Sequence, residues 1–198
     1  MASILLPTSP GPRAAKMNLM SFGTILTPFL GGPTQRINRL GTRWSMLVSM
    51  PPLMADPDGR VWANALAQAV EAGAVMPIVQ DIDTGSPGAP VVSANVASGS
   101  ILPLSGMTPG YQLRAGQFLS VIHGGRRYVY AIREAVTVGA GGTISASIFP
   151  LLRTALSTGD VVEIATPMIE GWIDSAFGWD VLQTPMIQIP DFTIVEAA

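Results

Sequence analysis

Hydrophobic and polar residues alternate along most of this chain in short runs that are separated by glycine and proline. Residues 44–50 form an apolar run with an aromatic residue, closed by two prolines, which predicts a strand. Residues 17–35 carry no charge, but glycine and proline interrupt them repeatedly. This stretch therefore predicts a strand, a turn and a strand, and it lacks the unbroken apolar length of a membrane span.

One segment has helical periodicity. Asp56 and Asp58 precede it and offer capping carboxylates, and Gly73 is placed to end it in a left-handed conformation. The apolar residues between them recur with the spacing of a single helical face: Val61, Trp62, Ala65, Leu66, Ala69 and Val70.

The segment from about residue 91 to residue 173 predicts a series of short strands. The clearest signal is a hairpin, in which residues 113–123 and 126–133 flank Gly124-Gly125. Further turn signals at residues 139–142 and 158–160 each precede another strand candidate, and such close spacing is typical of a small barrel or sandwich. Residues 186–195 are expected to form an edge strand or an extended arm, because Pro190 cannot donate to a ladder.

These elements predict a mainly β protein of the α+β class, with an N-terminal β element, one helix and an inserted small β-barrel. The expected division is residues 1–87 for the N-terminal part and residues 88–167 for the barrel. Residues 168–198 are expected to form an acidic return segment that packs on the first part or on a neighbouring molecule. A chain of 198 residues is long enough for a substantial core.

Composition adds an expectation of assembly. Charged residues make up 12% of the chain, about half the usual share of roughly 25%. Hydrophobic residues reach 48%, and the mean hydropathy is +0.40. A monomer has difficulty hiding that much apolar surface, and large exposed apolar patches usually mark interaction surfaces.

Charge is distributed unevenly along the chain. Residues 1–60 hold six basic and two acidic side chains, whereas residues 160–198 hold seven acidic side chains and no Lys or Arg. This asymmetry could orient copies head to tail, or the acidic residues could simply keep an apolar end soluble. Nucleic acid is not an expected partner, because the chain has one Lys and no basic stripe with interleaved aromatic residues.

Few catalytic or metal chemistries are compatible with this composition. The chain has no Cys and a single His, so thiolate sites, histidine clusters and His-dependent triads are excluded. Asp83-Thr84-Gly85 matches the aspartic-protease tripeptide, but one copy would need a homodimer, and we interpret it as a turn after a strand. Asp81 and Asp83 lack the later oxygen ligands of a calcium loop. His123 is expected to be solvated or bonded to backbone, and no cofactor is predicted.

Two blocks of the chain contain short motifs that occur in a fixed order. The first block comprises residues 27–35, Arg43-Trp44 and residues 50–53, followed by the helix with Trp62. The later block includes residues 113–119 and the Phe-Pro-Leu-Leu-Arg stretch that ends at Arg153, which is its most specific part. Together these segments resemble the distal or minor tail-tip proteins of long-tailed bacteriophages, and the similarity covers about residues 22–170. It departs from the family at Gln117, where an acid is expected.

This resemblance implies a structural subunit, not an enzyme, in the virion at the tail tip. Such proteins commonly form a six-fold ring that joins the tail tube to the tip or baseplate hub, so the expected partners are further copies, the tube protein and the hub proteins. The start of the chain lacks a signal peptide, which predicts synthesis and retention in the host cytoplasm. Aromatic residues are the expected interface anchors: Phe29, Trp44, Trp172 and Trp179.

Two other functions remain open at this point. A monomeric sugar- or peptide-binding β module would present a concave aromatic site. An enzyme resembling an aspartic protease would use Asp83 and is the third alternative.

Overall fold

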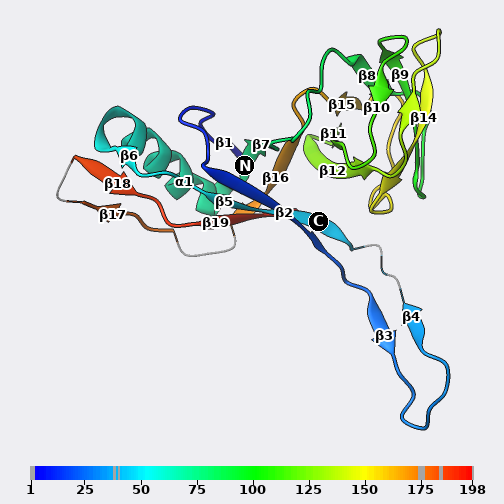
Figure 1. Cartoon of the computed structure of the whole chain (residues 1–198), viewed down its shortest axis with the longest axis horizontal. Coiled ribbons are helices and arrows are strands. Elements are labelled where there is room, and N and C mark those ends of the chain that lie inside the picture. Colours follow the sequence, from blue (N-terminus) through cyan, green and yellow to red (C-terminus); the bar gives the residue numbers. More distant parts are fainter. Residues whose placement is uncertain (1–2, 38, 40, 174–176, 183–184, 198) are drawn as a thin grey trace.

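The computed structural model describes residues 3–37, 39, 41–173, 177–182 and 185–197. The chain forms a sheet with one helix, which we call the body, a closed barrel beside it, and a two-stranded arm that projects away from both (Figure 1). The mainly β, α+β fold with an inserted barrel that the sequence predicts is confirmed.

The body sheet combines strands from the beginning, the middle and the end of the chain. Its order is β1-β7-β16-β19-β5-β2, and only the β1–β7 pair is parallel. The strands are β1 (Ile4–Leu5), β7 (Ala74–Pro77), β16 (Met168–Ile173), β19 (Phe192–Glu196), β5 (Arg43–Ser49) and β2 (Ala14–Met20). The predicted strand at residues 44–50 is thereby confirmed as β5.

Helix α1 (Arg60–Ala72) follows a short helical turn, η1 (Ala55–Gly59), and contacts β1, β7 and β16. The predicted helix is confirmed, but its buried face is turned slightly, because Ala63 is buried whereas Val61 and Val70 are exposed. Trp62 is fully buried as expected. The predicted capping by Asp56 and Asp58 is wrong: the N-cap position of α1 is Gly59, which has helical backbone and no side chain, and no side chain caps the helix. Gly73 ends the helix with a φ of +90°.

The barrel lies between β7 and β16 in the sequence. Its six strands close in the order β11-β12-β14-β9-β8-β15. They are β8 (Gly88–Val92), β9 (Ile101–Met107), β11 (Phe118–His123), β12 (Arg126–Ile132), β14 (Ile144–Phe149) and β15 (Val161–Glu163), with the small pair β10 (Gln112–Leu113) and β13 (Val136–Thr137) outside the closed ladder. The predicted hairpin is confirmed as β11–β12. Gly124 and Gly125 both have positive φ, as a mirror-image turn requires.

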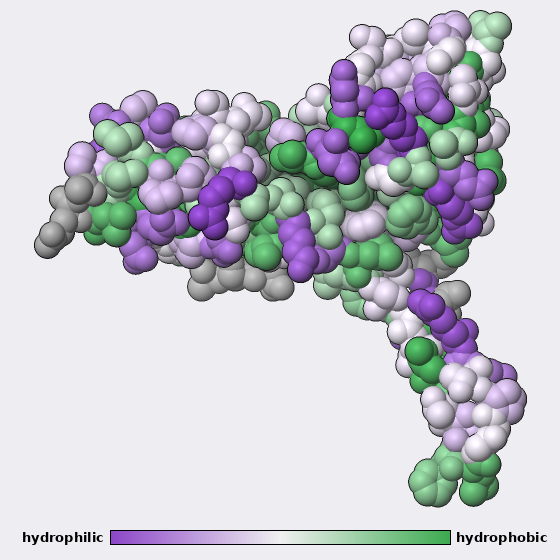
Figure 2. Space-filling model, viewed as in Figure 1, coloured by the Kyte–Doolittle hydropathy of each residue, from purple (hydrophilic) through white to green (hydrophobic). Residues whose placement is uncertain are grey.

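The arm consists of β3 (Thr24–Leu26), β4 (Gln35–Ile37) and the loop between them. This hairpin confirms the strand, turn and strand expected from residues 17–35. Its strands are exposed on both faces, and Phe29 and Leu30 at its tip are almost completely exposed. The apolar tip is the green end of the arm in Figure 2.

The last stretch of the chain differs from the expected edge strand. It forms β18 (Met186–Gln188) and then β19, and β19 lies in the middle of the body sheet between β16 and β5. Pro190 falls between the two strands, so it interrupts neither ladder. Strand β18 belongs to a separate small sheet with β17 (Asp180–Val181) and β6 (Leu53–Met54).

The described residues form two hydrophobic cores, and strand β12 contributes side chains to both. The body core lies between the sheet and α1, and the barrel has its own interior core. Strand β12 contributes Tyr130 and Ile132 to the barrel core, and Val129 and Ala131 to the body core. Since side chains of a strand alternate between its faces, β12 can join the two parts. Phe118 of β11 and Phe149 of β14 also pack against the body core. In the described part of the chain, no helix combines the length and the apolar character needed to cross a membrane.

Gly171 in β16 provides a direct test of the sheet pairing. A Cβ at this position would overlap the Val195 carbonyl oxygen of β19. We expect Gly171→Ala to lower the free energy of unfolding by about 3 kcal/mol or more, the top of the usual overpacking range, because backbone cannot move aside easily. Gly178→Ala is the matched control, since nothing lies within 4 Å of its added Cβ. Equal denaturant midpoints for the two variants would contradict the β16–β19 register.

Candidate functional site

Aromatic rings fill the junction between the body and the barrel. Trp44 of β5 packs its edge against Phe118 of β11, with ring centroids 5.0 Å apart, and it also contacts Phe149 of β14 at 5.8 Å. Trp44 is only 8% exposed. This residue, expected to anchor a contact with a neighbour, is therefore buried within its own chain and cannot serve that role on the surface.

Glu196 is the most buried charged group of the junction. Its Oε2 accepts the backbone N–H of Trp44 at 3.0 Å, and its Oε1 accepts the backbone N–H of Val129 at 2.6 Å. Oε1 also pairs with the Nη2 of Arg153. The carboxylate thus binds β5 of the body, β12 of the barrel and the segment after β14 together. Burial raises the pKa of Glu196 above its usual value of 4.5, although Arg153 and the two N–H donors oppose this shift.

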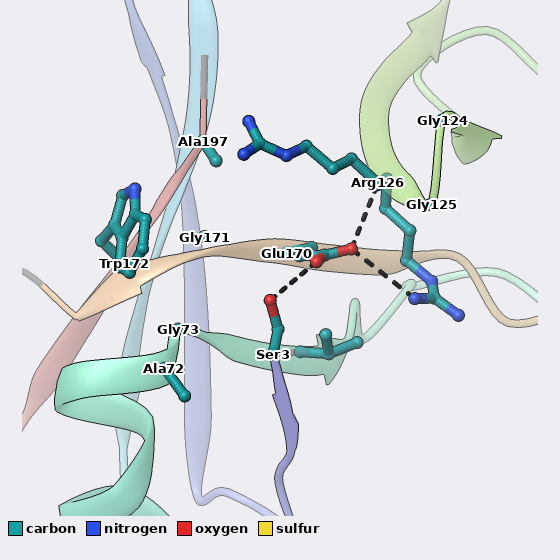
Figure 3. Close-up of a pocket in the computed structure, with 12 residues that line it drawn as sticks. Ser3, Ala72, Gly73, Gly124, Gly125, Arg126, Glu170, Gly171, Trp172 and Ala197 are labelled. Atoms are coloured by element: carbon teal, nitrogen blue, oxygen red, sulfur yellow. Dashed lines mark hydrogen bonds and ion pairs between the residues drawn. The ribbon is translucent and has the colours of Figure 1, made fainter. Parts of the chain in front are cut away.

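Glu170 of β16 makes a second link to β12, two residues earlier along the strand. Its Oε1 accepts the Ser3 hydroxyl at 2.7 Å, and its Oε2 accepts the Arg127 backbone N–H at 3.1 Å (Figure 3). The Arg127 guanidinium pairs with both Glu170, at 3.6 Å, and Glu163 of β15, at 3.1 Å. Ser120 completes this network by donating to Glu163 and accepting the Met168 N–H. Glu170 is consequently held on both oxygens.

Most acidic side chains of residues 160–198 have partners within the chain, which differs from both roles expected for them. Four of its seven acids bind groups of this same chain, namely Asp160, Glu163, Glu170 and Glu196. They neither form an acidic docking surface nor serve mainly as solubilising charges, because the strand pairing of β15, β16 and β19 turns them inward. Asp180 and Asp191 are exposed, and Asp174 lies outside the described residues.

His123 differs from expectation in its partner. Its Nδ1 lies 2.7 Å from Oδ2 of Asp160, so the imidazole is bound to a carboxylate and is neither free in solvent nor bonded to backbone. The pairing of β11 with β15 explains this contact, because Ile122 lies opposite Val161 and brings the adjacent residues together. Asp160 also accepts the Ser157 N–H, which makes the pair part of a turn.

A cavity of about 360 Å³ opens where the barrel meets the body (Figure 3). Glycines line it at the end of α1, in the β11–β12 turn and in β16, together with Arg126, Glu170 and Trp172. Trp172 is 54% exposed at its edge. Because both oxygens of Glu170 already have partners, this cavity offers a polar, partly aromatic recess and no free carboxylate for proton transfer.

The protease-like tripeptide is a turn, as its context predicts. The Asp83 carboxylate accepts the Gly85 N–H at 2.9 Å, and the Thr84 hydroxyl donates to the Ala165 carbonyl. Asp83 is exposed, and its side chain completes a local turn of the kind that aspartate favours. Within the described ranges, no group of three or more His, Asp or Glu side chains is placed to hold a metal ion.

The remaining expected anchors lie on separate surfaces. Phe29 is at the arm tip, Trp172 is at the cavity edge, and Trp179, which is 47% exposed, lines a groove beside α1. Sequence reasoning missed the junction residues Glu196 and Arg153. A glutamate that ends an alternating run of apolar residues, as in Phe192–Glu196, is the signal that could have indicated a buried carboxylate.

Comparison with models of known protein families finds no match, and the sequences of curated proteins give no match either.

Arg153→Met tests the role of the Glu196 pair. With both groups buried, removing the cation leaves an unpaired charge, and we expect a loss of about 3 kcal/mol of stability at neutral pH. Arg133→Met, an exposed arginine of the barrel, is the control and should change little.

The stability lost in Arg153→Met should be smaller at low pH than at high pH. Arg153 lowers the pKa of Glu196, so in Arg153→Met this pKa is still further above 4.5 than in the unchanged protein. A group whose pKa is raised by folding adds stability as pH falls through the folded value. The difference in the free energy of unfolding between Arg153→Met and the unchanged protein should therefore become smaller from pH 8 toward pH 5, as measured by denaturant titration. A difference that widens on acidification would contradict this account.

Proposed function

We propose that this protein is a structural subunit of a bacteriophage tail tip, in which copies form a ring that joins the tail tube to the tip or baseplate hub. The observation that supports this most is the projecting arm. Its tip places Phe29 and Leu30 almost fully in solvent, at the end of a two-stranded hairpin. Exposed apolar side chains on a projecting element are typical of a contact that another molecule completes.

The junction supports the same proposal. A ring subunit must hold its parts in fixed orientation, since each part meets a different neighbour. Here Glu196 and Glu170 bind the barrel strand β12 to the body. Trp44 of the body packs against Phe118 of the barrel and fills the space between the two parts. The junction therefore suits a subunit that transmits a fixed geometry along an assembly.

Residues from both blocks of the sequence resemblance contact the same carboxylate, that of Glu196. Its most specific segment, which ends at Arg153, closes β14 and supplies the cation that pairs with Glu196. Trp44, from the earlier block of similarity, donates its backbone N–H to the same carboxylate. Residues that support the resemblance thus meet at one structural point, which favours a shared architecture over chance similarity.

One observation favours the alternative of a monomeric binding module. The cavity at the junction combines the half-exposed Trp172 with Arg126 and several backbone groups, a combination that suits a sugar or a short peptide. This module would act without self-assembly, so a soluble ligand that binds a stable monomer would favour it. We propose no enzymatic activity, since the carboxylates of the junction are occupied by structural partners.

The location of the protein in a virus particle tests the proposal. Antibodies against the purified protein should label the tail end distal to the capsid in electron micrographs, and averaged end views should show a closed ring, with six copies expected. Labelling of the capsid, or virions without the protein, would overturn the tail-tip assignment. Isolated single copies at the tip would overturn the ring.

A further inference from the structure

We propose that the arm tip of one copy seats in the groove beside α1 of the next copy. The inference rests on the proposed function only in taking the neighbour to be a second copy of this chain. It identifies the two surfaces that meet, and both of them contain a residue expected from the sequence to anchor an interface, Phe29 on the arm and Trp179 in the groove.

The groove has a volume of about 460 Å³ and lies between α1 and the small sheet of β17, β18 and β6. Ala63 and Ala67 form its helical wall, and these small side chains leave the hollow open. Trp179, Val181 and Ile187 form the opposite wall. Trp179 is 47% exposed and Val181 is 77% exposed, so the groove presents apolar surface that its own chain does not cover.

The arm tip has the complementary shape and character. The Gly31 N–H donates to the Pro28 carbonyl at 3.3 Å, and Gly31 has a φ of +77°, so a turn holds Phe29 and Leu30 at the apex. Because this turn already fixes the backbone, little ordering is needed when the tip is buried. Two adjacent apolar side chains on a narrow hairpin suit a groove of this size.

The charges around the two surfaces are opposite in sign. The arm carries Arg36, Arg39 follows it in the sequence, and residues 21–42 contain no acid. Acidic residues adjoin the groove, with Asp180 between Trp179 and Val181, and Asp56 and Asp58 in the turn that leads into α1. Arg60 is the charged residue that lines the groove, and its guanidinium lies 4.0 Å from Asp56. The three acids lie close in sequence to lining residues and outnumber it. The surroundings of the groove are therefore net negative, which attracts the positive arm and repels a second groove.

The arm cannot fill the groove of its own chain in this conformation. The two features lie at opposite ends of the body, with the arm on one side and the α1 end with β17 and β18 on the other (Figure 1). A surface that fits a different surface at the far end of the same molecule generates head-to-tail contacts, which close into a ring where the rotation allows. The geometry thus explains how one chain can build a ring.

Cysteine cross-linking tests this contact, because the chain contains no cysteine. A mixture of Leu30→Cys protein and Ala67→Cys protein, oxidised at high concentration, should yield a disulfide-linked heterodimer that contains one chain of each variant. The matched control replaces the groove variant with Glu134→Cys, at an exposed residue of the barrel. This mixture should give at least five-fold less heterodimer. Adding Phe29→Ser to the Leu30→Cys chain should lower the yield by a similar factor. A chain with both cysteines should form a ladder whose largest member is the closed ring.

Equal dimer yields with Ala67→Cys and Glu134→Cys would overturn the inference, and so would a yield indifferent to Phe29→Ser. The two proposals can fail separately. If electron micrographs show a ring at the tail tip while the groove variant gives no specific cross-link, the proposed function stands and the arm binds elsewhere. If the specific dimer forms and virions lack the protein, the contact stands and the tail-tip function fails.

Discussion

A buried carboxylate on the last strand is the interaction on which the arrangement of this protein depends. Glu196 is fully enclosed, yet it accepts N–H groups from the body strand β5 and the barrel strand β12 and pairs with Arg153. Isolated burial of such a charge would be costly, so the group is tolerated only while all three partners are in place. The orientation of the barrel on the body is therefore tied to the folding of the chain's final residues.

The local elements could be predicted because their signals are local. Gly124-Gly125 defines a mirror-image turn whatever surrounds it, and the spacing around Trp62 defines a helix. Pro190 misled the prediction at the end of the chain, since proline forbids only its own place in a ladder. The strand that begins two residues later became the centre of the sheet. Which strands pair depends on contacts between distant segments, and spacing alone does not encode them.

The candidate site was less predictable than the fold. Charge counting suggested an acidic end, but Glu170 and Glu196 face inward because strands β16 and β19 are paired between others. Aromatic residues were recognised as anchors, whereas their exposure depends on tertiary packing: Trp44 is enclosed by the barrel, and Phe29 is carried outward by the arm. The apolar surplus of the sequence is thus divided between two cores and a set of exposed side chains that includes Phe29, Trp172 and Trp179, and the exposed set is the one available for assembly.

Hydrogen exchange at two amides measures the central claim, that Glu196 fixes the barrel to the body. The N–H groups of Trp44 and Val129 donate to this carboxylate. If the junction opens only when the whole chain unfolds, both amides should exchange as slowly as the amide of Met46 in the body core, and their rates should rise in parallel with denaturant. Exchange of Trp44 and Val129 that is much faster than that of Met46 and insensitive to denaturant would mean that the barrel detaches from a folded body, and it would contradict the account.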